Sequence, residues 1–117
     1  MIEWKRLDHV LITVPPGKKE EARKFYSGTL RLRELPGEHP RGAIWFQIGD
    51  VELHIREEEA GNISDRHPAF EVLNLKAAID FLEAQGVDLS FSSEIDGRKR
   101  CFFRDPFANR FELLSFY

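Results

Sequence analysis

Residues 51–58 read VELHIREE, and the Glu-Leu pair within this stretch recurs near the C-terminus at 112–113. The two stretches together indicate how the whole chain is organised. Side chains alternate between the two faces of a strand, so the apolar residues share one face while Glu52, His54 and Arg56 share the other. A polar face of this kind is either solvated, as in many antiparallel sheets, or it lines a site. The rest of the sequence bears on that choice.

The composition is that of one globular domain. The chain has 117 residues, 42% hydrophobic and 32% charged, and its net charge of −3 gives no argument for nucleic acid or an anionic membrane as a partner. No apolar run approaches a membrane span, and residues 1–5 do not resemble a signal sequence, so we expect a cytoplasmic protein. The single cysteine, Cys101, fits a reducing compartment and is expected to be a buried thiol.

Hydrophobic periodicity predicts two helices, over 18–30 and 75–85, the second between the N-cap Asn74 and Gly86. Runs of β-branched and aromatic residues predict eight strands. They lie over 7–14, within 31–42, within 43–58 on either side of Gly49-Asp50, and over 67–72, 87–92, 98–104 and 110–117.

This order is strand, helix and three strands, given twice, so units 1–58 and 59–117 are two copies of one βαβββ pattern. His9 and His67 fall on the first predicted strand of each unit, and Glu52 and Glu112 fall on the last. The histidine and glutamate are separated by 43 residues in the first unit and by 45 in the second, and leucine follows both glutamates.

Side-chain alternation places four residues on the opposite face of the strands from the residues that pack on the helices: His9, Glu52, His54 and His67. We therefore expect these four on the concave side of a curved sheet. Two imidazoles with one or two carboxylates form the ligand set of a divalent metal that keeps open positions for a substrate. The same residues could equally be solvated or satisfied polar groups, and spacing alone leaves both interpretations open.

Five segments carry a resemblance to a known family: LDHVLITV, ARKFYSGTLRLRELP, WFQIGDVELHIRE, HPAFEV and RCFFRDPFANRFELLSFY. Together they resemble the vicinal oxygen chelate superfamily, the glyoxalase, bleomycin-resistance and extradiol-dioxygenase group, over essentially the whole chain. The last segment is similar to the signature F-x-D-P-x-G-N-x-x-E-L. Ala108 stands where that signature has glycine, so the turn there is expected to be strained or reshaped.

The resemblance implies one α+β domain over 1–117, in which two βαβββ units form a cupped, partly open mixed β-sheet barrel with the helices outside. It also implies one divalent metal ion (Zn, Ni, Co, Mn or Fe) held by His9, His67 and Glu112, with a fourth ligand from the last strand of the first unit. The repeat favours Glu52 as that ligand, because Glu52 matches Glu112, and leaves His54 as a pocket histidine.

Three functions follow from the resemblance. The first is a metal-dependent lyase or isomerase resembling glyoxalase I, acting on a small substrate whose adjacent oxygens chelate the metal, with Glu52 or Glu112 as the base. The second is an iron-dependent extradiol-type dioxygenase with His54 as the acid-base group, and the third is a non-catalytic resistance protein that binds a small molecule. Family members are commonly homodimers, so we expect a homodimer, with each site in one chain or shared between two.

Further pocket residues are expected beside the ligands. Trp45 and Gln47 share one face of their strand and are predicted to form the floor of the substrate pocket, although Trp45 could equally belong to the core. An inward Arg100 would suit an anionic substrate, whereas an outward one would be a solvated edge residue. His39 lies in a predicted loop and is expected to be exposed.

Overall fold

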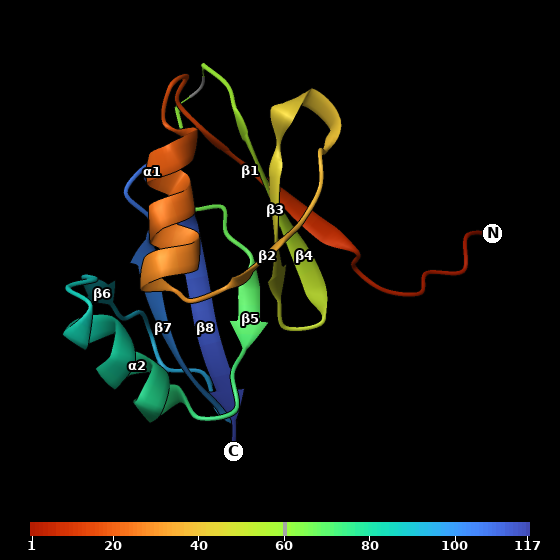
Figure 1. Cartoon of the computed structure of the whole chain (residues 1–117). Helices are drawn as coiled ribbons and strands as arrows, with labels where there is room; N and C mark the ends of the chain where they lie inside the picture. The colour runs from red at the N-terminus through yellow and green to blue at the C-terminus, as the bar shows by residue number, and fades with distance from the viewer. Residues whose placement is uncertain (60) are drawn as a thin grey trace. The chain divides into compact units, whose positions relative to one another are not determined.

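The structure, a computed structural model, describes residues 1–59 and 61–117. The chain divides into two compact units, Met1–Ala60 and Gly61–Tyr117, and each has its own four-stranded sheet (Figure 1). No helix of the described residues is long and apolar enough to cross a membrane.

The first unit has strand β4 at its centre. Its elements are β1 (His9–Val14), α1 (Lys19–Arg23), η1 (Lys24–Thr29), β2 (Arg33–Leu35), η2 (Pro40–Gly42), β3 (Ile44–Ile48) and β4 (Val51–Glu57). The sheet order is β1-β4-β3-β2, with β1 parallel to β4 and the other pairs antiparallel. Residues 1–8 form no helix or strand and run out from the start of β1 (Figure 1).

One face of this sheet carries the core of the first unit. Its buried apolar residues alternate along the strands, as the sequence predicts, and are Ile12, Val14, Ile44, Phe46, Val51, Leu53 and Ile55. The helical segment adds Ala22, Phe25 and Tyr26, and α1 lies against β4. Burying a large apolar side chain stabilises a fold by roughly 1.5–3 kcal/mol, so this face holds the unit together and leaves the opposite face free for polar groups.

The helix predicted over 18–30 changes its geometry at Lys24. Helix α1 ends at Arg23, and η1 continues as a π-helix in which the Leu30 N–H donates to the carbonyl oxygen of Phe25, five residues back, at 2.9 Å. The apolar stripe fits both geometries, which is why the sequence pattern predicts helix here but not its type.

The second unit repeats the arrangement. Its elements are β5 (Ala69–Glu71), α2 (Leu75–Ala84), β6 (Leu89–Ser90), β7 (Arg98–Arg104) and β8 (Arg110–Phe116). The sheet order is β5-β8-β7-β6, with β5 parallel to β8, and α2 lies against β6, β7 and β8. The predicted N-cap is confirmed, because the side chain of Asn74 accepts a hydrogen bond from the Ala77 N–H at 3.0 Å. The two predicted βαβββ units are therefore confirmed.

The register shows that His9 and His67 are not equivalent positions. His9 is the partner of Glu52 across β1 and β4, whereas the partner of Glu112 across β5 and β8 is Ala69. The prediction that His67 lies on the first strand of its unit is wrong, since β5 begins two residues later. His67 lies two residues before the position equivalent to His9, which is why the histidine and glutamate are 45 residues apart in the second unit and 43 in the first. A shift of two residues keeps a side chain on the same face of an extended chain.

The turn between β7 and β8 is built on Asp105, as the sequence predicts. One carboxylate oxygen of Asp105 accepts hydrogen bonds from the backbone N–H groups of Phe107 (2.9 Å) and Asn109 (2.8 Å). Between them, Ala108 has a φ of +73°, the left-handed region in which a Cβ is strained. The family's glycine at this position therefore has a conformational reason, and the alanine keeps the turn at a cost.

Replacing Ala108 by glycine is expected to raise the free energy of unfolding by about 1 kcal/mol, because glycine adopts a positive φ without strain. Urea unfolding measures the change. As a control, Ala77→Gly in α2 should lower the stability by about 0.5–1 kcal/mol, because glycine weakens a helix. An unchanged or lower stability of Ala108→Gly would show that the turn carries no such strain.

Cys101 is expected to resist thiol reagents in the folded protein. It is fully buried, as the sequence predicts, and burial raises the pKa of its thiol, so the reactive thiolate is scarce at neutral pH. A chromogenic disulfide reagent should modify it only after denaturant is added. Rapid modification of the native protein at pH 8 would contradict this burial.

Candidate functional site

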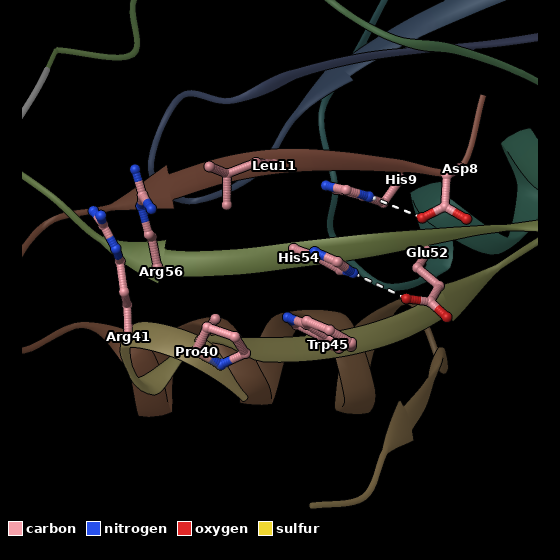
Figure 2. A pocket seen from close by; sticks show the side chains of 10 residues that line it. Asp8, His9, Leu11, Pro40, Arg41, Trp45, Glu52, His54 and Arg56 are labelled. Carbon is pink, nitrogen blue, oxygen red and sulfur yellow. Dashed lines mark hydrogen bonds and ion pairs between the residues drawn. The ribbon is translucent and has the colours of Figure 1, made fainter. Parts of the chain in front are cut away.

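A pocket of about 400 Å³ lies on the polar face of the first unit's sheet (Figure 2). Its lining residues come from the end of the N-terminal segment, from β1, β3 and β4, and from the turn at η2: Asp8, His9, Leu11, Pro40, Arg41, Ala43, Trp45, Glu52, His54 and Arg56. Four of the predicted site residues are thus brought together, namely His9, Trp45, Glu52 and His54. The polar face of VELHIREE lines this pocket.

Four aromatic rings form a stacked column along this pocket, in the order His39, Trp45, His54 and His9. The centroids of neighbouring rings lie 4.1, 3.9 and 4.1 Å apart. Trp45 and His54 are nearly parallel, at 2°, because they are direct partners across β3 and β4. The column fixes the plane of His54 from both sides.

The expectation of an exposed His39 is wrong. Its ring is half-buried against Trp45, and its Nε2 lies 3.1 Å from the carbonyl oxygen of Leu35. A loop histidine finds such a position only when the loop folds back over the sheet, which no local sequence pattern reports.

His9 is oriented by its neighbour in the sequence. Its Nδ1 lies 3.0 Å from Oδ2 of Asp8, and this hydrogen bond is the main cause that lowers the pKa of Asp8. A carboxylate accepts but does not donate, so Nδ1 carries the proton and the lone pair of a neutral His9 is on Nε2. Asp8 therefore presents His9 as a ligand or base through Nε2.

Glu52 and His54 form the second pair of the pocket. Nε2 of His54 lies 2.9 Å from Oε1 of Glu52, and the Glu52 side chain is 34% exposed, so a substrate can reach it. The register places Glu52 beside His9 on the adjacent strand, as the repeat predicts. Gln47 has another role, because its amide donates to the carbonyl oxygens of Gly49 (2.9 Å) and Val51 (3.0 Å) and so closes the β3–β4 turn.

In the second unit, His67 and Glu112 form a pair of their own. Nδ1 of His67 lies 2.7 Å from the carbonyl oxygen of Asp65, which can only accept, and 3.1 Å from Nη1 of Arg110, which can only donate, so the two contacts favour opposite tautomers of the ring. Nε2 faces Oε1 of the buried Glu112 at 3.0 Å. At this distance a proton or a cation lies between the two atoms, and a neutral His67 supplies that proton when Nε2 carries it.

Arginines surround this second pair. Nη1 of Arg100 lies 3.6 Å from Oε1 of Glu112, and the guanidinium of Arg110 lies 4.1 Å from the ring centroid of Phe102. Arg100 is mostly buried, and its Nη2 donates to the carbonyl oxygen of Ser93 at 3.0 Å. The structure therefore places Arg100 beside the predicted ligand Glu112 rather than at a solvated edge.

The histidine and glutamate side chains of the two units suit a divalent metal, and one observation argues against a metal. In both units the first histidine has Nδ1 beside an oxygen acceptor, as metal-binding histidines usually do, and Nε2 of His67 faces Oε1 of Glu112. Imidazole and carboxylate ligands suit zinc, nickel, manganese and iron. Against this, the guanidinium of Arg100 already lies beside the Glu112 carboxylate. Within either unit, no three histidine, cysteine, aspartate or glutamate side chains among residues 1–59 and 61–117 form a metal-binding group.

Sequence reasoning missed several residues of these two clusters. Asp8 carried a signal, because it directly precedes His9, but it lies before β1, where strand alternation does not apply. Arg56 shares the polar face of VELHIREE with Glu52 and was left without a role. Arg41 belongs to a turn and has no periodic signal.

The comparisons with known proteins bear on the whole chain. The family model described as the Glyoxalase/Bleomycin resistance protein/Dioxygenase superfamily matches residues 6–113. A Bacillus anthracis protein described as a glyoxalase family member is 34% identical in its solved structure, with a TM-score of 0.89 over 100% of both chains. No curated protein matches this chain.

Two more distant solved structures share the fold. Lactoylglutathione lyase from Agrobacterium tumefaciens is 15% identical, with a TM-score of 0.76 over 97% of this chain and 95% of that one. TnmS3, an antibiotic-binding protein from Streptomyces sp. CB03234, is 17% identical, with a TM-score of 0.77 over 100% of both chains. The family model and the 34% identical structure decide the membership: the chain belongs to the glyoxalase, bleomycin-resistance and dioxygenase superfamily.

Proposed function

We propose that this protein is a metal-dependent lyase or isomerase, resembling glyoxalase I, that acts on a small substrate with two adjacent oxygens. The observation that carries the proposal is the matched state of His9 and His67. In each, Nδ1 lies beside an oxygen acceptor, at 3.0 Å and 2.7 Å, so Nε2 is the nitrogen proposed to bind the metal. Two unrelated local contacts, to a side chain in one unit and to a backbone carbonyl in the other, produce the same result.

The proposed ligands are His9 and Glu52 from the first unit and His67 and Glu112 from the second. The chemistry of these groups fits a divalent ion, which can take the place of the proton between Nε2 of His67 and Oε1 of Glu112. A bound metal supplies Lewis-acid polarisation of the substrate oxygens.

The chain's own residues supply the proton transfer. Glu52 is the proposed base, because its carboxylate is partly exposed on the pocket wall and can take a proton from a substrate carbon and return it. His54 holds this carboxylate at 2.9 Å, and the ring column holds His54, so the base is positioned before the substrate arrives. Positioning of this kind lowers the entropic part of the barrier.

A second candidate function is a metal-free binding protein. It is favoured by one observation, the guanidinium of Arg100 beside Oε1 of Glu112, which supplies the positive charge that a metal would otherwise provide. The antibiotic-binding protein TnmS3, which shares the fold, is an example of binding in this architecture.

Metal analysis separates the two candidates. The enzyme proposal predicts about one equivalent of divalent metal per chain after expression in metal-supplemented medium. Iron in place of zinc, nickel, cobalt or manganese would favour the dioxygenase reaction. Less than about one-tenth of an equivalent of any divalent metal would leave the binding protein as the better account.

Substitutions of Glu52 and His54 test which of them is the ligand. We expect Glu52→Gln to weaken zinc binding by about tenfold or more, because it removes a ligand charge, and His54→Gln to weaken it less, because it removes only a supporting hydrogen bond. Competition with a chromogenic chelator measures both affinities. If His54→Gln has the larger effect, His54 is the ligand and the repeat is misleading at this position.

A further inference from the structure

We propose that the substrate is a small organic anion whose acidic group is held by Arg41 and Arg56; this rests on the proposed function, since it names the substrate class of the same pocket. Both arginines line the pocket, one from the turn at η2 and one from β4 (Figure 2). Among residues 1–59 and 61–117, neither has a hydrogen bond or an ion pair with another residue. The pocket wall thus presents two guanidinium groups that the protein itself does not neutralise.

The two carboxylates of the pocket each have a hydrogen-bond partner. Asp8 pairs with Arg6 at 3.3 Å and with His9 at 3.0 Å, and Glu52 pairs with His54 at 2.9 Å. The two carboxylates are therefore occupied at one end of the pocket, and the two unpaired cations stand apart from them. Arg41 is exposed and Arg56 is half-buried, so water solvates both guanidinium groups in the empty protein, and an anion that reaches both would form charge-assisted hydrogen bonds with them.

The backbone at Arg41 gives a second argument. Arg41 has φ of +58° and ψ of +26°, the left-handed conformation that residues with a Cβ avoid. Gly42 follows with a φ of +67°, so two successive residues take this conformation where one is a glycine and the other is not. Strained conformations of this kind concentrate at binding sites, because they persist where a side chain has to be presented in one direction.

The spacing along β4 indicates the size of the ligand. Arg56 and Glu52 lie four residues apart on the same face of β4, which corresponds to about 13 Å between their Cα atoms. The surface between the two ends is apolar and aromatic, formed by Leu11, Pro40 and Trp45. A ligand that fits has an acidic group at the arginine end, a short apolar or planar body, and its reacting atoms at the His9 and Glu52 end.

Carboxylate, phosphonate and phosphate groups share the geometry that two guanidinium forks recognise. Benzoate and phenylphosphonate therefore serve as probes of the anion, and benzamide serves as an uncharged probe of nearly the same shape as benzoate. Titration of the full chain, followed by the backbone amide signals in NMR, reports both the affinity and the residues that move.

In the wild-type protein we expect saturable binding of both anions, with the largest shifts at residues 41–45 and 52–56, and at least about tenfold weaker binding of benzamide. The double variant Arg41→Gln/Arg56→Gln should bind the anions at least about tenfold more weakly. Arg33→Gln, an exposed arginine of β2 outside the pocket lining, is the matched control and should bind as the wild type does. If the double variant loses its folded spectrum, Arg41→Lys/Arg56→Lys replaces it and should show weakened binding, because lysine keeps the charge and loses the fork.

The titrations are run with excess chelator, so that their outcome does not depend on a metal. If the metal analysis finds no bound metal while the titrations show anion binding, the proposed enzyme is overturned and the anion site is retained. Equal binding of benzoate by the wild type and the double variant, equal binding of benzamide and benzoate, or no saturable binding of either anion would each overturn the anion site and leave the metal proposal untouched.

Discussion

The parallel pairing of the first and last strands of each unit is the constraint on which both clusters depend. In the first unit this pairing sets β1 beside β4, so His9 and Glu52 become neighbours although 43 residues separate them. In the second unit it sets β5 beside β8 and brings His67 to Glu112. A slip of one residue in either register would turn the polar side chains into the core and the apolar ones out of it. The buried faces therefore hold the polar groups in place.

The ring column adds rigidity where the chemistry is proposed. His54 is buried, and the rings of Trp45 and His9 stack on it and oppose motion out of its ring plane. Its Nε2 lies 2.9 Å from Oε1 of Glu52. The column thereby positions His54 against the carboxylate that is proposed as the base, while Arg41 and Arg56 line another part of the pocket.

The sequence predicted the repeat, the strand faces and the pocket position of His9, Trp45, Glu52 and His54, because alternation and duplication are properties of the chain itself. It did not predict the two-residue displacement of His67, since the short β5 begins after this histidine and a strand's exact start depends on its pairing partner. It also missed Asp8, His39 and Arg41, all of which lie in turns or extended segments. Their positions follow from how these segments fold back on the sheet, which no periodic pattern encodes.

The central claim is that His9 and His67 bind a metal through Nε2 while Nδ1 keeps its hydrogen bond. The ¹⁵N NMR signals of the histidine side chains, recorded before and after one equivalent of zinc is added, test it most directly. The account predicts that, with zinc bound, Nδ1 of both histidines carries a proton and that Nε2 of both shifts together. If zinc leaves both Nε2 signals unchanged, or removes the proton from Nδ1 instead, the histidines are not the ligands and the account is wrong.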